Sequence, residues 1–255
     1  MAEETANRLQ REKEFHNEAF SSDTREKTKK YYRTTLESKQ FYRDVVSEDV
    51  KGKKILEYGC GPGSQAFTLA KRGAEVDAID ISEVAIEQAG EQAEKLGVNI
   101  NFTVMDAESL DFEDDTFDLV CGSGILHHLD LEKCYRELTR VLKPGGKGVF
   151  FEPMGYHPIV NAYRKLTPSM RTEDEHPLLI EDIRLAETFF DTVETHYFHL
   201  SSFAASFLPG DALKRGASAV LNKMDTAIFK MAPFLKKYAW IVVLELINKP
   251  GKTTL

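Results

Sequence analysis

Two histidines and a glutamate are the residues of this chain best suited to proton transfer. His127 and His128 follow the apolar segment FDLVCGSG, and Glu152 ends the later segment KGVFFE. If these segments are neighbouring strands of one parallel sheet, an imidazole and a carboxylate meet at the strand ends. We hypothesise that His127 acts as a general base and that Glu152 orients it or stabilises the imidazolium. The alternative is structural: the histidines cap the next helix and Glu152 binds its own loop.

A glycine-rich turn is the second chemical signal. Glu57, Gly59, Gly61 and Gly63 lie between the apolar segment ILEY and an amphipathic segment. Glycines let the backbone turn sharply and approach a ligand closely, and ligands bind beyond strand ends in open parallel sheets. A tight turn without a ligand is the alternative. The G-x-G-x-G spacing differs from the G-x-G-x-x-G of nicotinamide oxidoreductases, which disfavours that class.

Two carboxylates follow the glycine-rich turn at expected strand ends. Asp80 ends VDAID, where it can accept hydrogen bonds from both hydroxyls of a ribose. Asp106 ends FTVMD, where it can accept a hydrogen bond from an adenine amino group, with Met105 or Ala107 against the ring. For Asp106 the alternative is a solvated side chain. Together the two positions predict a nucleoside-like ligand.

The segments around these residues alternate between strands and helices. From residue 55 onward, short β-rich runs are separated by helical patterns, which is typical of a parallel α/β sheet. The run CYRELTRVLK predicts a helix that Pro144 and two glycines close, directly before the strand KGVFFE. Two further strands, THYFHLSSF and WIVVLELIN, are joined by an amphipathic stretch from Asp211 to Lys237. We predict an α/β, Rossmann-like, doubly wound fold.

Composition limits the classes of function. With 255 residues, 42% of them hydrophobic, the chain can bury the core of one large domain. Its net charge of -8 disfavours a nucleic-acid partner, and its three cysteines lack the spacing of a zinc cluster or a disulfide framework. The histidines are scattered, so we expect no metal site. No apolar run is long enough to span a membrane, and the charged N-terminus is unlike a signal peptide, so we expect a cytoplasmic protein.

Five motifs in order resemble those of the class I S-adenosylmethionine-dependent methyltransferases. They are ExGxGxG from Glu57, Asp80, MDAESLDFEDDTFDLV, ILHHL and RVLKPGG, within residues 50–155. The resemblance implies a seven-stranded, mostly parallel sheet with an antiparallel last strand, and S-adenosylmethionine as the cofactor across the strand ends. It assigns the glycines to the methionine part and Glu57 to its ammonium group. The expected cofactor contacts are Glu57, Gly59, Cys60, Gly61, Gly63, Asp80, Ile81, Met105, Asp106, Ala107 and Gly122.

The stretch from Glu152 to Leu178 is too long for an ordinary connection and is expected to contact substrate. It resembles the EPxGHNP motif of a bacterial subgroup that acts on small molecules. Tyr156 occupies the position of the histidine in that motif. Predicted substrate contacts are Tyr32, His128, His157, Arg171 and His176. The alternative is that the His-Pro pairs are turn signals and the RTEDE run is a solvated or salt-bridged surface.

These expectations define the domain organisation and the function. Residues 1–50 form an N-terminal helical cap, and residues 51–255 a methyltransferase domain with a substrate loop at 153–178 and a helical insertion at 209–238. In that insertion, Val220, Met224, Ile228 and Phe229 form a helical stripe that either covers the substrate or packs on the sheet. We expect methyl transfer to a small organic molecule, at oxygen in preference to carbon, nitrogen or sulfur. RNA or protein methylation, and cofactor binding without catalysis, are the alternatives.

Overall fold

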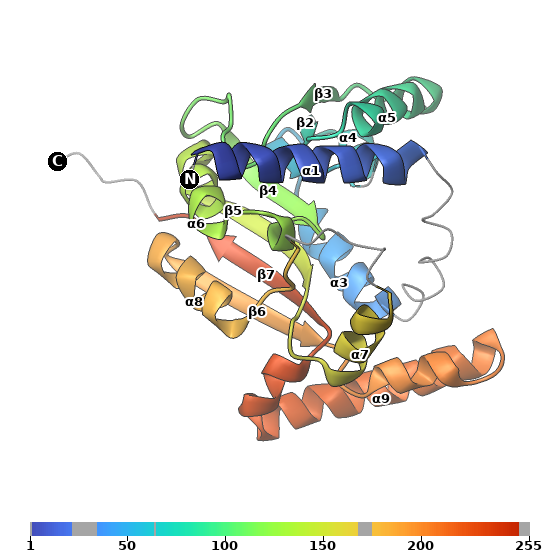
Figure 1. Ribbon diagram of the computed structural model, residues 1–255. Helices are drawn as coiled ribbons and strands as arrows, with labels where there is room; N and C mark the ends of the chain where they lie inside the picture. The colour runs from blue at the N-terminus through green and yellow to red at the C-terminus, as the bar shows by residue number, and fades with distance from the viewer. Residues whose placement is uncertain (1, 22–34, 64, 168–174, 250–255) are drawn as a thin grey trace.

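A seven-stranded sheet forms the centre of the molecule (Figure 1). The computed structural model describes residues 2–21, 35–63, 65–167 and 175–249. The strands are β1 (Lys54–Tyr58), β2 (Glu75–Asp80), β3 (Asn101–Val104), β4 (Phe117–Ser123), β5 (Leu142–Pro153), β6 (Thr192–Phe198) and β7 (Ile241–Ile247). Their order is β3-β2-β1-β4-β5-β7-β6. Strand β7 runs antiparallel to both β5 and β6, and the other pairs are parallel. The predicted doubly wound sheet with one antiparallel strand is confirmed.

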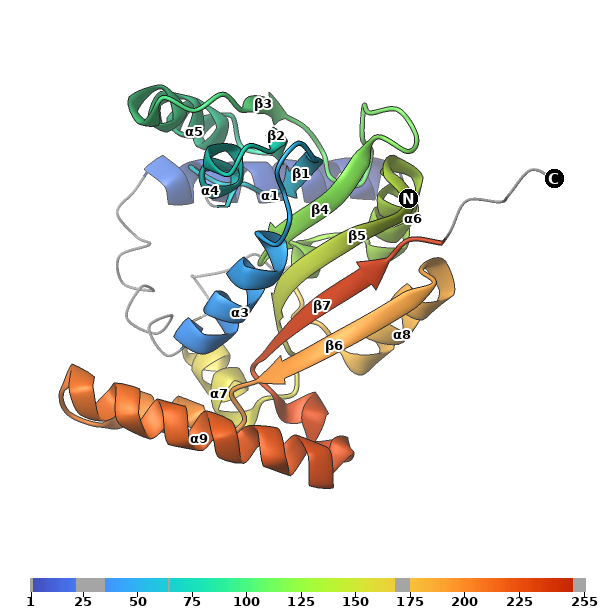
Figure 2. The same ribbon diagram turned by 180° about the vertical axis from the view of Figure 1, so that it is seen from behind.

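Helices cover both faces of this sheet (Figures 1 and 2). In chain order they are α1 (Ala2–Ser21), α3 (Leu36–Val46), α4 (Ala66–Lys71), α5 (Glu83–Leu96), α6 (Leu131–Val141), α7 (Pro158–Leu166), α8 (Ile180–Phe189) and α9 (Asp211–Met231). The 3-10 helices η2 (Leu126–His128), η4 (Ser202–Phe207) and η5 (Pro233–Tyr238) lie between these elements. One apolar cluster packs α6 and α8 on the sheet, and a second packs α3 and α4 on the other face.

Strand order reverses its direction beside β1. Strand β1 pairs with β2 on one side and with β4 on the other, so the direction of winding reverses between β1 and β4. In open α/β sheets this reversal separates the connecting loops at the carboxyl ends of the strands, which is where ligands bind. The glycine-rich turn follows β1, and the loop with His127 follows β4. The fold therefore brings the predicted cofactor and catalytic residues to the side of the sheet where the parallel strands have their carboxyl ends. This side is called the sheet edge below.

The structure corrects two predicted elements. The helix expected over residues 134–143 ends at Val141, because β5 begins at Leu142 and includes the Pro-Gly-Gly run. The register between β4 and β5 shifts after Phe117, which accommodates these residues at the start of the strand. Part of the expected substrate loop is helical: His157 accepts a hydrogen bond from the backbone N of Val160, and Pro158 occupies the first turn of α7. A capping side chain followed by proline is a strong signal for the start of a helix. We did not use this signal at His157 and Pro158 and treated the segment as a loop.

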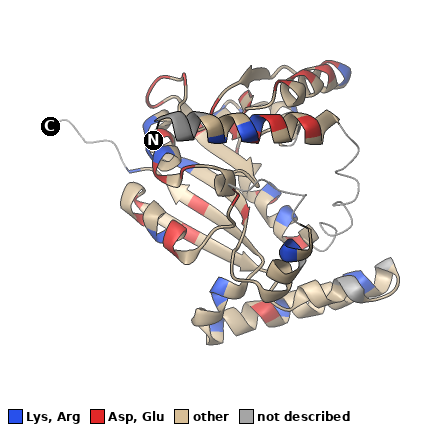
Figure 3. Ribbon diagram, in the orientation of Figure 1, with Lys and Arg blue, Asp and Glu red and all other residues tan. Residues whose placement is uncertain are grey.

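Helix α9 packs through a face that includes only part of the expected stripe. Phe229 of that stripe is buried beside Asn222 and Asp225, whereas Val220 and Met224 are exposed. The Asp225 carboxylate explains this orientation, because it accepts hydrogen bonds from the backbone N atoms of Leu200 and Ser201 before η4 and of Ser202 at its start. Figure 3 shows basic positions along α9. None of the helices in the described ranges is long and apolar enough to cross a membrane.

Candidate functional site

The glycine-rich turn lies against the end of β2. Gly59, Gly61 and Gly63 have φ values of 57°, 54° and 107°, a region that favours glycine. The backbone N of Cys60 donates to the Ile79 carbonyl at 3.0 Å, and that of Gly61 donates to Asp80 Oδ2 at 2.9 Å. The turn is thus held by backbone donors, which keeps its peptide groups at the strand ends.

Glu57 has a role in the fold that the sequence did not indicate. Its carboxylate is buried and accepts hydrogen bonds from the backbone N of Gln65 at 3.0 Å and of Ala66 at 2.8 Å. These donors open helix α4, where a negative charge is favourable. Glu57 therefore fixes the helix that follows the glycine-rich turn. Its contact with an ammonium group stays a prediction.

Asp80 and Asp106 lie at the ends of β2 and β3. Asp80 is buried, with Oδ1 accepting from the backbone N of Ser82 at 2.9 Å, while its carbonyl accepts from the backbone N of Met105 at 3.0 Å. Asp106 Oδ1 accepts from the backbone N of Glu108 at 2.9 Å, and within the described ranges Oδ2 has no hydrogen-bond partner. Burial raises the pKa of Asp106. Ala107 is buried beside it.

The remaining predicted cofactor residues line the same edge. Ile81 and Met105 are half-buried, and Cys60 is buried. Burial raises the pKa of the Cys60 thiol, so the neutral thiol is its form at neutral pH. A Cβ atom at Gly122 would lie 2.7 Å from Ile125 Cγ2, and one at Gly59 would lie 2.9 Å from Ile125 Cδ1. These two glycines therefore make room for Ile125 at the junction of β1 and β4.

His127 and Glu152 meet as predicted. The His127 Nδ1 atom lies 2.7 Å from Glu152 Oε2, and both side chains are buried. Glu152 Oε1 also accepts from the backbone N atoms of Ile125 and Leu126, each at 2.9 Å. A carboxylate with this many partners is held in place, so Nδ1 is the ring atom that carries a proton toward it. Nε2 is then the ring atom that can accept a proton.

The end of the expected substrate loop runs beside His127. The backbone N of His176 donates to the His127 carbonyl at 3.1 Å. Glu175 Oε1 lies 3.9 Å from His127 Nε2 and pairs with Arg164 of α7 at 2.7 Å. Glu175 therefore faces the proton-accepting atom of His127. The high charge density of the RTEDE run was visible in the sequence. The contact of Glu175 with His127 was not, because it depends on the path of the chain in the fold.

Helix α1 lies across the strand ends and supplies residues that the sequence did not single out. Arg8 donates to the His128 carbonyl at 2.8 Å and pairs with the buried Glu108. Asn17 Oδ1 accepts from Ser82 Oγ at 2.5 Å. The helix thus contacts the loops after β2, β3 and β4 together. Of the predicted N-terminal cap, it is this helix that covers the carboxyl ends of β2, β3 and β4.

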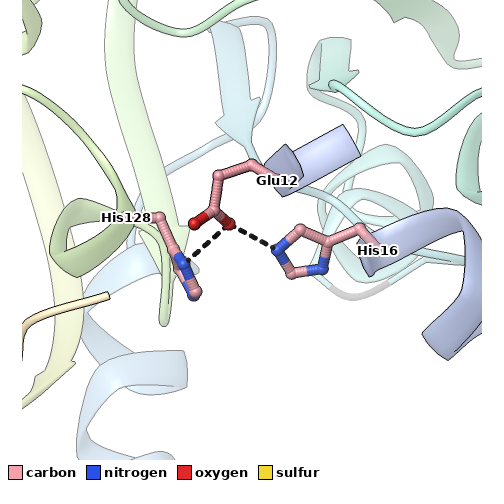
Figure 4. A group of neighbouring side chains, drawn as sticks. All are labelled: Glu12, His16 and His128. Atoms are coloured by element: carbon pink, nitrogen blue, oxygen red, sulfur yellow. Dashed lines mark ion pairs between the residues drawn. The ribbon is translucent and has the colours of Figure 1, made fainter. Parts of the chain in front are cut away.

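A compact group of side chains joins α1 to η2 (Figure 4). It consists of Glu12 and His16 from α1 and His128 from η2. Glu12 Oε2 lies 3.5 Å from His16 Nε2 and 3.2 Å from His128 Nδ1. Burial favours the neutral form of His128, but the nearby carboxylates outweigh it and raise its pKa, Glu12 most strongly. These nitrogen and oxygen atoms lie within 4.8 Å of one another, a donor set that could hold a divalent cation. The spacing of Glu12 and His16, four residues apart on a helix, was the available signal.

The other predicted substrate residues are in three situations. Tyr32 and Arg171 lie outside the described residues. His157 is buried, and its ring nitrogens contact the backbone N of Val160 at 3.3 Å and the Leu200 carbonyl at 3.2 Å. Both ring nitrogens of His157 are thus engaged within the fold, which points to a capping role. His128 and His176 lie next to His127.

Known proteins resemble the central part of the chain in sequence. The methyltransferase domain family matches residues 55–146. A ubiquinone biosynthesis O-methyltransferase of Coxiella burnetii is 38% identical over 103 residues, which are 40% of this chain and 44% of that protein. The chain thus matches less than half the length of this relative. Residues 55–146, which the family matches, contain the glycine-rich turn, Asp80, Asp106, His127 and His128.

Solved structures resemble most of the chain in fold. The Haemonchus contortus phosphoethanolamine N-methyltransferase 2, in complex with S-adenosyl-L-methionine, has a TM-score of 0.60 at 17% identity, covering 86% of this chain and 56% of that one. The cyclase SpnF has a TM-score of 0.58 at 22% identity, covering 84% and 82%. At such identities the likeness establishes the fold and leaves the chemistry to the site.

Proposed function

We propose that this chain, which has the domain and the sheet of the class I S-adenosylmethionine-dependent methyltransferases, transfers a methyl group to an oxygen of a small organic molecule. One observation carries the proposal: the glycine-rich turn, Asp80 and Asp106 share a sheet edge with a buried His127–Glu152 pair. The first set has the chemistry of a nucleoside site, and the pair has that of proton transfer. The relative from Coxiella burnetii is named as an O-methyltransferase, which supports oxygen as the acceptor.

The donor atoms of the edge fit S-adenosylmethionine. Asp80 would accept hydrogen bonds from ribose hydroxyls, because each of its oxygens accepts only one backbone hydrogen bond from the described residues. Asp106 would accept one from the adenine amino group, and its Oδ2 has no competing partner within the described ranges. When bound, the cofactor supplies a methyl group on a cationic sulfur that leaves as a neutral thioether. Helix α1 would close over this edge and exclude water.

His127 removes the proton that methyl transfer to oxygen releases. The bound cofactor would supply the methyl carbon to the acceptor oxygen and would keep, on its sulfur, the electron pair of the bond that the transfer breaks. The acceptor's proton passes to His127 Nε2, since Nδ1 is directed at Glu152. The Glu152 carboxylate stabilises the resulting imidazolium, and Glu175, 3.9 Å from Nε2, adds to that stabilisation. Holding the acceptor in line with the breaking bond is the other requirement.

Cofactor binding is the first test. Calorimetric titration with S-adenosylmethionine should show binding, and titration with NADH should show none. Replacement of Asp80→Ala should weaken binding by about 100-fold, because two hydrogen bonds to a charged group are lost. Asp118→Ala is the matched control, since this carboxylate also accepts from a backbone N, that of Lys54, but lies at the opposite edge of the sheet. Binding of NADH alone would refute the proposal.

Catalysis by His127 needs a separate test. A screen of phenols and alcohols with labelled S-adenosylmethionine identifies an acceptor, and His127→Ala should then lower kcat by about 100-fold or more. Its affinity for the cofactor should stay at the wild-type value. His196→Ala, on strand β6, is the control and should keep full turnover. If His127→Ala also turns over at the wild-type rate, His127 is not the base, although methyl transfer itself would stand.

A further inference from the structure

Helix α9 has one face that packs on the protein and one that does not. On the packed face, Asn222 Nδ2 donates to Glu37 of α3, and Asp225 Oδ1 accepts from Ser201 Oγ at 2.6 Å. Phe229 completes this face, with its ring 6.2 Å from that of Tyr197. These contacts are directional, so they fix the rotation of the helix about its axis. The opposite face is directed away from the protein.

That opposite face carries a stripe of apolar side chains. Leu213, Val220, Met224 and Met231 are 53%, 60%, 50% and 79% exposed. At 3.6 residues per turn, the four side chains project within about 40° of one another. Phe234 of η5, 72% exposed, follows the same helix. These five residues are called the apolar stripe below. Exposed apolar residues are ordinary when they are scattered, but a continuous stripe indicates a binding surface.

Positive charge accompanies the apolar stripe. Residues 212–238 contain six basic side chains, Lys214, Arg215, Lys223, Lys230, Lys236 and Lys237. The span of α9 and η5 holds two acidic residues: Asp211, the first residue of α9, and Asp225, which is buried and accepts a hydrogen bond from the backbone N of Leu200. The whole chain has a net charge of -8, so this segment opposes the sign of the rest. Lys223 and Lys230 project about 90° from the stripe, where their apolar stems can lie along it while their ammonium groups stay in water.

We propose that α9 and η5 dock on an anionic membrane surface, with the apolar stripe in the lipid interface and the lysines at the headgroups. A helix with lysines on its polar side and Leu, Val, Met and Phe on the other has the composition of an interfacial helix. The charge asymmetry of the chain would turn this end toward an anionic surface and the acidic remainder away from it.

A second copy of the chain fits this face less well. In a symmetric dimer through the stripe, the two cationic helices would lie against each other, and Lys223 and Lys230 would face like charges. An anionic surface instead pairs each of these lysines with an opposite charge. The described helices include none that could cross a membrane, so the contact lies along the surface. This inference goes beyond methyl transfer and does not require it.

Vesicle binding tests the proposal. The full chain is sedimented with vesicles of phosphatidylcholine alone and with vesicles that also contain phosphatidylglycerol. Two double variants address the two parts of the surface: Val220→Asp with Met224→Asp, and Lys223→Glu with Lys230→Glu. The matched controls are Leu36→Asp on α3, where the side chain is 57% exposed, and Lys95→Glu on α5. Thermal unfolding confirms that each variant is folded, and Met224→Asp alone replaces the first double variant if that one is not.

The wild type and both controls should bind the anionic vesicles, and added salt should weaken this binding. Each double variant should bind at least about tenfold more weakly, since each basic residue near an anionic surface contributes several-fold. Failure of the wild type to bind the anionic vesicles would overturn the proposal, as would wild-type binding by both double variants. A dimer in sedimentation equilibrium that the double variants dissociate, with no vesicle binding, would assign the face to a second copy.

Discussion

The two halves of the sheet edge are held together in different ways. Within the strand ends of β1, β2 and β3, the hydrogen bonds of the described residues join positions no more than 25 apart: Asp80 binds the backbone of Gly61, Ser82 and Met105. Around the ends of β4 and β5 and under helix α1, the contacts join segments farther apart, as with the backbone N of His176 and the His127 carbonyl. The first half is a local structure that a short motif can encode. The second half is assembled by tertiary contacts, and its chemistry depends on them.

Removal of Glu152 should have the largest effect on the second half. Glu152→Ala leaves the backbone donors of Ile125 and Leu126, and the His127 ring, without their buried acceptor. We expect the free energy of unfolding to fall by about 4 kcal/mol in urea titration, because each buried donor left unpaired costs about 1–3 kcal/mol. The exposed Glu87→Ala on α5 should change it by less than about 0.5 kcal/mol. Equal effects would show that the second half is not held by this carboxylate.

Protonation of His199 should have the next largest effect. Its ring is buried between Ser38 Oγ and Ser202 Oγ, both at 2.8 Å, and burial lowers its pKa from 6.5 to about 4. Nearby, Asp225 acts to raise this pKa and His157 to lower it. The unfolded chain takes up a proton below pH 6.5 that the folded protein binds only near pH 4. Stability should therefore be complete above pH 6.5 and fall as pH drops toward 4.

The loss should be about 3 kcal/mol, from the relation between a pKa difference and a free energy. Chemical denaturation across this pH range measures it, with His199→Gln as the control that cannot titrate. The contribution of His199 is the difference between the wild-type and variant slopes. Parallel pH dependences for the two proteins would contradict a buried neutral His199.

Substitution in the glycine-rich turn tests the first half. A Cβ atom at Gly63 would lie 1.9 Å from Phe67 Cε2, on a backbone with a φ of 107°. We expect Gly63→Ala to lower the free energy of unfolding by about 2 kcal/mol, the cost of a strained backbone. Gly90 in α5 has open space around it, so Gly90→Ala should raise stability by about 0.5–1 kcal/mol. If Gly63→Ala leaves the free energy of unfolding unchanged or raises it, the turn does not need glycine at this position.

The contact of α1 with the edge should have the smallest effect. Asn17→Ala removes the hydrogen bond from Ser82 Oγ, and we expect a loss of about 1 kcal/mol together with faster proteolysis within α1. Gln10→Ala removes an exposed contact with Glu14 on the same helix and is the matched control. Identical proteolysis of the two variants would show that Asn17 does not hold α1 on the edge.

Much of the fold could be predicted because its signals are local. Strands β1 to β5 were expected from apolar runs separated by turn residues, and each appears in the sheet. The errors occur where distant contacts decide. Leu142 begins a strand because β4 pairs with it, although the sequence through Lys143 has a helical pattern. Val220 and Met224 are exposed because Asp225 binds the backbone near Leu200 and turns α9.

The site divides in the same way. Asp80, Asp106 and the glycines were predicted by their positions after strands, and the pairing of His127 with Glu152 followed from two neighbouring strand ends. Glu12, His16 and Arg8 were missed, because nothing in a helical charge pattern states which surface the helix will cover. The sequence did not indicate that the Glu57 carboxylate also binds the first turn of α4, and its contact with a ligand stays a prediction.

Periodicity, turn residues and the order of motifs were enough to predict the doubly wound sheet and to place the glycine-rich turn, Asp80 and Asp106 at one end of it, because alternating apolar residues and turn residues are local signals. The covering helix α1, the neighbours of His127 and the exposed face of α9 needed the folded chain. Each of these features depends on a few directional contacts between segments that lie far apart in sequence. Such contacts leave no periodic signal in the sequence, and they place the residues around which proton transfer and membrane docking are proposed.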